Sequence, residues 1–373
     1  MKARGVHLQY RFQADDQRGA DVSNPLFELL SAIAEQGSIH HAALAMGASY
    51  RHVWGACKAW EESLGEPLLH WAKGQPARLT PFAERLLWAE RRARVRMAPH
   101  IEALRAELER VLAEALDGSH QVLTIHASHD LALPMLRDLA SSARLHIDLR
   151  FAGSMDALRA LAEGRCAVAG FHVPPLADQR RHFARALKPL LQPGRHKLIG
   201  CMRRTQGLMV APGNPLALRE LADALAPGLR FVTRQPGSGT RLLAEHLLAE
   251  RGLAPGLLDR AQSLQGSEDS HLAVAAAVAA GDGDAALGIE AAAARFGLGF
   301  VPLIEEDYFL VCLDDLLEQG AVQSLRAVLQ QAAFARSLGE LPGYQAWHAG
   351  EVLSLTRALP WWRFRRGKGV GGA

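Results

Sequence analysis

Two predicted helices separated by a two-residue turn constrain the fold of the N-terminal region most strongly. The helix IHHAALAM follows Ser38, a residue type that caps helices, and it ends at Gly47. Ser49 then caps the next helix, YRHVWGACKAWEESLG, so that the turn consists only of Gly47 and Ala48. A helix, a tight turn and a second helix in succession predict a helix-turn-helix unit.

The segments that follow predict a wing and a long helix. Residues 68–71 and 77–80 are expected to pair as a hairpin, which is the wing. A helix is predicted from Thr80-Pro81 to about Leu116, as a linker and dimer interface. Pro99 lies inside this helix and leaves two shorter helices as an alternative, because proline kinks or breaks a helix interior.

The start of the second helix is where such a unit meets the base edges of the DNA major groove. Arg51 suits a bidentate contact to guanine, worth roughly 1–3 kcal/mol of discrimination, and Ser49 and Tyr50 suit phosphates. The predicted DNA-contacting residues are Ser38, Ser49, Tyr50, Arg51 and His52, together with Lys73 and Arg78 on the wing. Residues 1–118 contain 15 basic and 15 acidic side chains, so charge alone does not favour DNA, and a plain helical bundle is the alternative.

This N-terminal region resembles the DNA-binding domain of the ModE family of molybdate-responsive regulators and, more broadly, the LysR-type winged helix. The segments LLSAIAEQGSIHHAALAMGASYRHVWGACKAWEESLGEPLL and ARLTPFAERLL carry the resemblance. The run from Ser49 to Trp54 is closer to ModE. The resemblance implies a transcription regulator that binds double-stranded DNA as a homodimer or tetramer.

From about Gln121 onward, short apolar strands alternate with helices, which predicts an α/β domain with a parallel sheet. VLTIHAS, HIDLRFAGS and CAVAGFHV are strands in this pattern, and LGFVPLIEEDYFLVCL is expected to form two more. Four widely spaced cysteines form no metal or redox motif and are expected to be buried thiols. The chain shows no signal sequence or membrane span, so a cytoplasmic protein is expected.

The loop RQPGSGTR between a predicted strand and a predicted helix carries the strongest ligand signal. Main-chain N–H groups and hydroxyls at a helix N-terminus favour an anion, and Arg234 and Arg241 add positive charge. Polar residues after neighbouring strands are expected at the same edge of the sheet. The predicted ligand-binding residues are Ser128, His129, Asp130, Ser154, His172, Arg234, Gly237, Ser238, Gly239, Thr240, Arg241 and Glu268. Helix capping is the alternative role of each polar residue, and no metal site is predicted.

Residues 122–329 resemble the two-lobed, periplasmic-binding-protein-like domain found with molybdenum-related regulators and molybdopterin biosynthesis proteins. ASHDLALPML, GLMVAPGNP, RFVTRQPGSGTRLL, SHLAVAAAVAAGDGDAALGIEAAAA and FVPLIEEDYFLV carry this resemblance. It implies a sensor of a small anion, with molybdate or tungstate first and a molybdopterin-like ligand next. Inward-facing Asp130, Glu268 or Asp269 would oppose a bare dianion and suit a pterin, and the sequence leaves their direction open.

The predicted fold class is an all-α winged helix-turn-helix domain followed by an α/β two-lobed domain. The predicted divisions are an N-terminal segment (1–22), the DNA-binding domain (23–80), the linker helix (81–118), the sensing domain (119–335) and a C-terminal helix with a basic tail (336–373). No covalent cofactor, membrane partner or enzymatic activity is expected, since no nucleophile–base pair is visible. A molybdopterin enzyme and a storage binder remain the alternative functions.

Overall fold

The computed structural model describes residues 12–13, 21–22, 24–70, 77–116, 121–175, 180–259 and 267–362. The chain divides into two compact units, Met1–Ala98 and Pro99–Ala373. Among the described residues, no helix is both long enough and apolar enough to cross a membrane.

Three helices, a hairpin and the first part of a long fourth helix build the described part of the first unit. The three helices and the hairpin are α1 (Asn24–Gln36), α2 (Ile39–Ala45), α3 (Tyr50–Leu64), β3 (Leu69–His70) and β4 (Arg78–Leu79), and a further strand pair, β1 (Phe12–Gln13) with β2 (Asp21–Val22), precedes them. Leu26, Leu30 and Val53 are among the side chains of one buried apolar core. The strands β3 and β4 pair antiparallel, which confirms the predicted wing.

Serine caps set the boundaries of the two predicted helices. The Ser38 hydroxyl accepts from the main-chain N–H of His41 at 3.2 Å, and the Ser49 hydroxyl accepts from that of His52 at 3.1 Å. Gly47 adopts φ +64°, a left-handed conformation that ends α2 and lets the chain turn into α3. The helix-turn-helix prediction is therefore confirmed, and its turn depends on this glycine.

The helix α4 (Pro81–Leu116) is continuous and contains Pro99. The alternative of two separate helices is therefore wrong. The boundary between the two compact units falls within this helix, so its C-terminal part from Pro99 belongs to the second unit.

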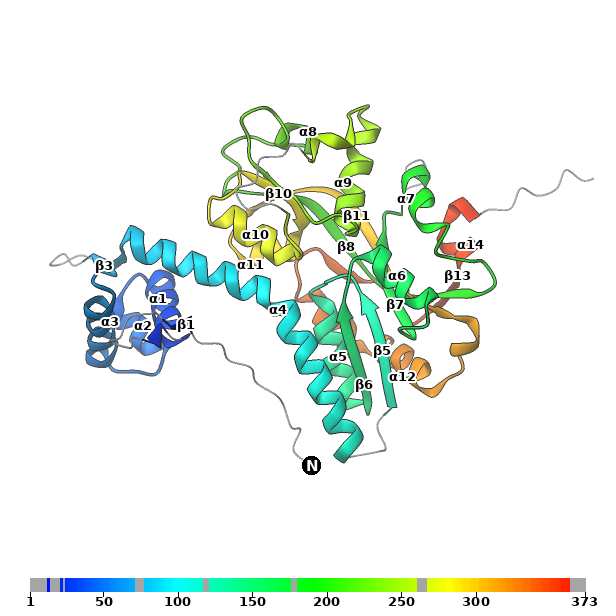
Figure 1. Ribbon diagram of the computed structural model, residues 1–373, viewed down its shortest axis with the longest axis horizontal. Coiled ribbons are helices and arrows are strands. Elements are labelled where there is room, and N and C mark those ends of the chain that lie inside the picture. Colours follow the sequence, from blue (N-terminus) through cyan, green and yellow to red (C-terminus); the bar gives the residue numbers. More distant parts are fainter. Residues whose placement is uncertain are drawn as a thin grey trace, which may run out of the picture. The chain divides into compact units, whose positions relative to one another are not determined.

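The second unit contains a nine-stranded mixed sheet in two lobes (Figure 1). In the first lobe, β5 (Gln121–Ala127) pairs parallel with β6 (Leu145–Phe151) and β7 (Val168–Val173). In the second lobe, β9 (Phe231–Val232) pairs parallel with β10 (Ala285–Ile289). The two-lobed prediction is confirmed.

Two long strands, β8 (His196–Val210) and β11 (Gly299–Leu313), run through both lobes. They pair antiparallel with each other; β7 pairs with β11 and β10 with β8, again antiparallel. The expectation of a purely parallel sheet is therefore wrong, as is the expectation of two strands in 298–313. Two register irregularities, beside Pro302 and Tyr308, interrupt β11 without ending it.

Helices and short strands complete the second unit. They are α5 (Ala132–Ser142), α6 (Ser154–Ala162), α7 (Arg180–Leu187), α8 (Leu221–Ala224), α9 (Gly239–Glu250), α10 (His271–Ala279), α11 (Glu290–Arg295), α12 (Gly320–Leu329), α13 (Ala332–Gly339), β12 (Tyr344–Ala346), β13 (Val352–Ser354) and α14 (Leu355–Ala358). The strands β12 and β13, which the sequence did not predict, both pair with β8. All four cysteines are free and buried, as expected.

Candidate functional site

The first turn of α3 presents the predicted DNA-contacting side chains to solvent. Tyr50, Arg51 and His52 are exposed, whereas Val53, the next residue, and Cys57, one turn beyond it, are buried in the core of the first unit. This division explains why the helix contains both apolar and polar residues, because one face packs in the core and the first turn faces solvent. Burial also raises the pKa of the Cys57 thiol to about 12, so it stays protonated and unreactive.

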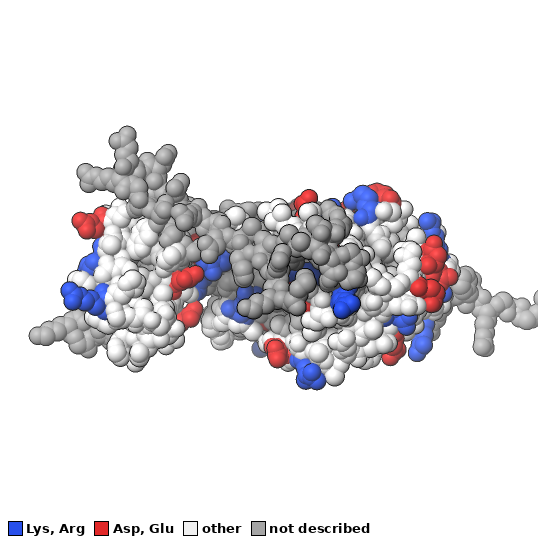
Figure 2. Space-filling view, turned by 90° about the horizontal axis from the view of Figure 1, so that it is seen from below, with Lys and Arg blue, Asp and Glu red and all other residues white. Residues whose placement is uncertain are grey.

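Ser38 and Ser49 serve as helix caps, and their predicted contacts with DNA remain predictions. Arg78 is exposed on the wing, and Lys73 lies outside the described residues. On the face shown in Figure 2, basic side chains are interspersed with acidic ones and do not form one patch.

A cavity of about 470 Å³ lies in the second unit, bounded by both lobes and by the C-terminal part of α4. Seven of the predicted ligand residues line it: Ser128, His129, His172, Arg234, Ser238, Gly239 and Thr240. Gly239 faces His172 so closely that a Cβ atom would overlap the imidazole ring, so only glycine fits there. The loop GSGT and the ends of the first-lobe strands therefore meet at one cavity, as the sheet-edge argument predicted.

Arg234 is the principal charge of the cavity. Its Nε and Nη2 atoms donate to the main-chain oxygens of Glu268 (3.2 Å) and Asp269 (2.7 Å), and Nη1 has no partner among the described residues. Burial, together with the positive charge of Arg204, lowers the pKa of Arg234 to about 10, while the carboxylates of Asp269 and Glu268 oppose this shift, so Arg234 remains a cation at neutral pH. A side chain that is only 7% exposed therefore carries a positive charge and one unused donor, which suits a bound anion.

Two buried histidines, His172 and His271, line the same cavity. Burial and the charges of Arg204 and Arg234 lower the pKa values of His172 and His271 well below 6.5. Each imidazole is then neutral at pH 7, with one N–H and one acceptor nitrogen. His172 Nε2 and His271 Nδ1 have no hydrogen-bond partner among the described residues.

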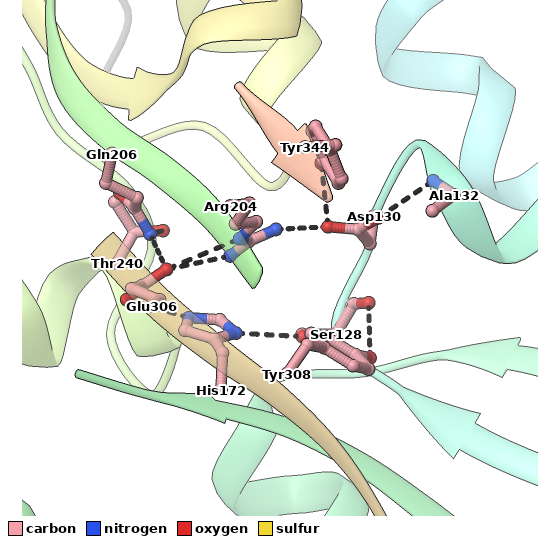
Figure 3. A network of polar contacts seen from close by, with 10 residues as sticks. All are labelled: Ser128, Asp130, Ala132, His172, Arg204, Gln206, Thr240, Glu306, Tyr308 and Tyr344. Atoms are coloured by element: carbon pink, nitrogen blue, oxygen red, sulfur yellow. Dashed lines mark hydrogen bonds and ion pairs between the residues drawn. The ribbon is translucent and has the colours of Figure 1, made fainter. Parts of the chain in front are cut away.

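A buried polar network borders the cavity where the long strands cross between the lobes (Figure 3). Arg204 on β8 pairs with Asp130, which follows β5, and with Glu306 on β11. Gln206 Nε2 donates to Glu306 Oε2 (2.6 Å) and to the Thr240 hydroxyl (3.3 Å), and Tyr344 donates to Asp130 (2.9 Å). The network connects the first lobe, the crossing strands and the first turn of α9.

Five predicted ligand residues do not line the cavity. Asp130 belongs to the network, Arg241 pairs with Glu245 (3.0 Å) and Asp259, and Glu268 is buried. Ser154 and Gly237 also lie outside the cavity lining. Of the three carboxylates whose direction the sequence left open, Asp269 is the one that reaches the cavity.

The sequence reasoning missed other lining residues, which are Pro99, His100, Ala103, Leu104 and Glu107 of α4, and Arg150, Phe151, Ala152, Gly153, Gln235 and His271. Phe151 ends β6 and His271 begins α10. Their positions at the ends of elements could have indicated from the sequence that they lie at the ligand-binding edge of the sheet. The helix α4 carried no such signal, because the C-terminal part of this helix packs in the second unit beside residues that are distant in the sequence. The described residues contain no group of three or more His, Cys, Asp or Glu side chains placed to hold a metal ion.

Comparisons with known proteins match both units. The PBP superfamily domain matches residues 136–330, and the helix-turn-helix of bacterial regulatory proteins of the LysR family matches residues 26–84. The uncharacterized protein YvgK of Bacillus subtilis (strain 168) is 27% identical over 266 residues, which cover 70% of this chain and 82% of YvgK.

Solved structures to which the chain is similar include an OxyR mutant of Corynebacterium glutamicum with bound hydrogen peroxide. It is 20% identical, with a TM-score of 0.41, and the match covers 84% of this chain and 95% of that one. Full-length BenM is 18% identical, with a TM-score of 0.41 and coverage of 82% and 94%.

Proposed function

The chain belongs to the PBP superfamily and carries the helix-turn-helix of the LysR family of bacterial regulatory proteins, and we propose that it responds to a small anion. It is a DNA-binding transcriptional regulator with an effector-binding domain, and not an enzyme. The proposal includes a cytoplasmic location, where such a regulator meets DNA.

The observation that carries the anion proposal is Arg234. A buried guanidinium without a carboxylate hydrogen-bond partner is costly, and an anionic ligand would remove that cost. The main-chain N–H groups at the start of α9 supply further donors. These donors lie in the cavity between two lobes, where closure of the lobes would enclose a ligand.

Molybdate or tungstate is the first candidate effector. A bare oxyanion needs donors only, and Ser128, Ser238 and Thr240 line the cavity together with Arg234. The ModE-like sequence of α3 also favours a molybdenum-related regulator.

An organic anion of the molybdopterin class is the second candidate, favoured by the size of the cavity. Its volume of about 470 Å³ falls in the range of roughly 300–1,000 Å³ typical of pockets for organic ligands. Phe151, Ala152 and Leu104 add an apolar wall that a tetrahedral oxyanion would not use. A pterin phosphate would occupy both the wall and the anion-binding end.

A thermal shift assay of the chelator-treated protein with molybdate, tungstate and sulfate tests the first candidate. A ligand at 100 times its dissociation constant adds about 2.7 kcal/mol, which raises the melting temperature by several degrees. A rise with molybdate or tungstate but not with sulfate supports the oxyanion sensor. No rise with any of the three excludes it and leaves the organic anion.

A homodimer, with pairing into a tetramer as a further step, is the proposed assembly. Met97, Leu104, Leu108 and Val111 on α4 are each between 40% and 50% exposed. Their spacings of seven, four and three residues are those of a coiled-coil seam, which a second copy of α4 would cover. A dimer would also present two copies of α3 to two DNA half-sites.

In the proposed mechanism, the effector stabilises the closed arrangement of the lobes and thereby shifts the dimer between two geometries. Only the difference in affinity between the two arrangements can drive this shift. A storage binder that dimerises through its N-terminal helices is the competing function. The test is the affinity of Arg51→Ala for the DNA upstream of this protein's gene, with Arg336→Ala as a control at an exposed position. A loss of affinity in Arg51→Ala supports the regulator, and an unchanged affinity favours the storage binder.

A further inference from the structure

Asp269 places a hydrogen-bond acceptor at the anion-binding end of the cavity. Its Oδ1 atom is inaccessible to solvent and has no hydrogen-bond partner among the described residues. Asp269 and Arg234 both line the cavity, and the main-chain oxygen of Asp269 accepts from Arg234 Nη2 at 2.7 Å. The charge of the Asp269 carboxylate also acts to raise the pKa of Arg234. An anion held by Arg234 would therefore lie beside the Asp269 carboxylate.

A carboxylate in this position distinguishes between anions by their hydrogen atoms. Sulfate, molybdate and tungstate are fully deprotonated at pH 7 and offer no donor, so they would leave Oδ1 unpaired beside a second negative charge. An anion with an O–H or N–H group would donate to Oδ1 and satisfy it. A site that accepts a hydrogen bond from its ligand discriminates strongly against an analogue that lacks the donor. This discrimination is far stronger than that of an apolar pocket between ligands of slightly different size.

We infer that Asp269 makes the cavity selective for anions that also carry a hydrogen-bond donor next to the charged group. This inference rests on the proposed function, because it assumes that Arg234 binds the anion. Hydrogen phosphate groups and acids with a neighbouring hydroxyl or amino group belong to this class. The inference ranks such ligands above bare molybdate or tungstate and so separates the two candidate effectors.

Titration calorimetry of the full-length protein at pH 7 and constant ionic strength tests the inference with inorganic phosphate, sulfate and molybdate. Phosphate retains at least one P–O–H group at this pH, and the other two ions have none. We expect phosphate to bind roughly 10- to 100-fold more tightly than either. Equal affinities, stronger binding of sulfate or molybdate, or no binding of phosphate would overturn the inference.

Asp269→Asn supplies the decisive variant, because the amide has the shape of the carboxylate but donates hydrogen bonds and carries no charge. We expect this variant to bind sulfate and molybdate more tightly and phosphate more weakly than the wild type, so that the preference narrows or reverses. Asp315→Asn is the matched control, since it removes the same charge from an exposed residue outside the cavity lining. If both variants change all three affinities equally, the selectivity is not due to Asp269.

Arg234→Gln distinguishes failure of this inference from failure of the proposed function. If Arg234→Gln loses all anion binding, the anion site is supported. If the wild type in addition binds phosphate and molybdate with equal affinity, the role of Asp269 is rejected while the anion site remains. Unchanged binding in Arg234→Gln would reject the anion site itself. Melting temperatures of each variant establish that it is folded.

Discussion

Arg204 and Glu306 are paired directly across the middle of the two strands that join the lobes. The Nε and Nη2 atoms of Arg204 lie 3.3 Å and 3.2 Å from Glu306 Oε2, and both side chains are fully buried. The register of β8 and β11 also places the two residues opposite each other. An ion pair thus joins the two strands that run through both lobes.

Removal of the Arg204 charge should destabilise the second unit strongly. Arg204→Met leaves Asp130 and Glu306 buried without their cation, which costs about 3–5 kcal/mol of unfolding free energy. Chemical denaturation measures this loss. Arg159→Met breaks an exposed ion pair with Asp156 and should cost about 1 kcal/mol or less. Equal losses in the two variants would show that the buried network does not hold the unit together.

Stability should fall as the pH drops below about 6.5. The pKa values of His172 and His271 are lowered in the folded state, and those of His126, His196 and His246 are lowered too. The unfolded chain therefore binds protons that the folded chain excludes, so the stabilisation is present above pH 6.5 and lost below it.

Among the residues that the structure describes, Glu306 opposes this pH dependence. Burial raises the pKa of Glu306, so its contribution is present below pH 4.5 and is lost as the pH rises. Five histidines against one carboxyl give a net loss on acidification. Denaturation at pH 7.5 and pH 5.5 measures it, and His271→Gln should reduce the difference by up to about 1.4 kcal/mol per pH unit. A protein that is more stable at pH 5.5 contradicts this account.

Ser49 allows helix capping to be separated from DNA contact. Ser49→Ala loses the hydrogen bond from the His52 N–H and should lower stability by about 1 kcal/mol. Ser49→Asp keeps a cap and suits the helix dipole, so stability should be retained while the new charge repels DNA phosphates. Melting curves and fluorescence anisotropy at one salt concentration measure the two effects. Full DNA affinity in a stable Ser49→Asp protein would place the start of α3 away from DNA.

Leu108 tests the proposed seam on α4 without touching the cavity. Leu108→Glu puts a charge in the middle of the apolar stripe and should shift the protein from dimer toward monomer in analytical ultracentrifugation. Ala89→Glu introduces the same charge at an exposed position of α4 outside the stripe and should not. If both variants stay dimeric, another surface forms the dimer.

Local signals in the sequence predicted the helix-turn-helix, since caps, glycines and helical spacing all lie within a few neighbouring residues. The loop around Ser238 and Thr240 was predicted for the same reason. Asp130 was assigned to the ligand, but its partner Arg204 lies 74 residues away on a strand whose length the sequence did not reveal. The partners of a buried charge depend on which strands are neighbours and on their register. The hydrophobic pattern along one strand does not reveal which distant strand will lie beside it.

The most direct test of the account is whether an anion bound at Arg234 changes the affinity for DNA. Fluorescence anisotropy with the upstream DNA, with and without saturating phosphate or molybdate, compares the wild type with Arg234→Gln. The account predicts that the anion changes the DNA affinity of the wild type by at least about 5-fold, which is the lower end of typical allosteric coupling. It predicts no such change in Arg234→Gln, and equal DNA affinities of the two proteins when no anion is present. An equal response in both proteins, or no response of the wild type to an anion that it binds, would contradict it.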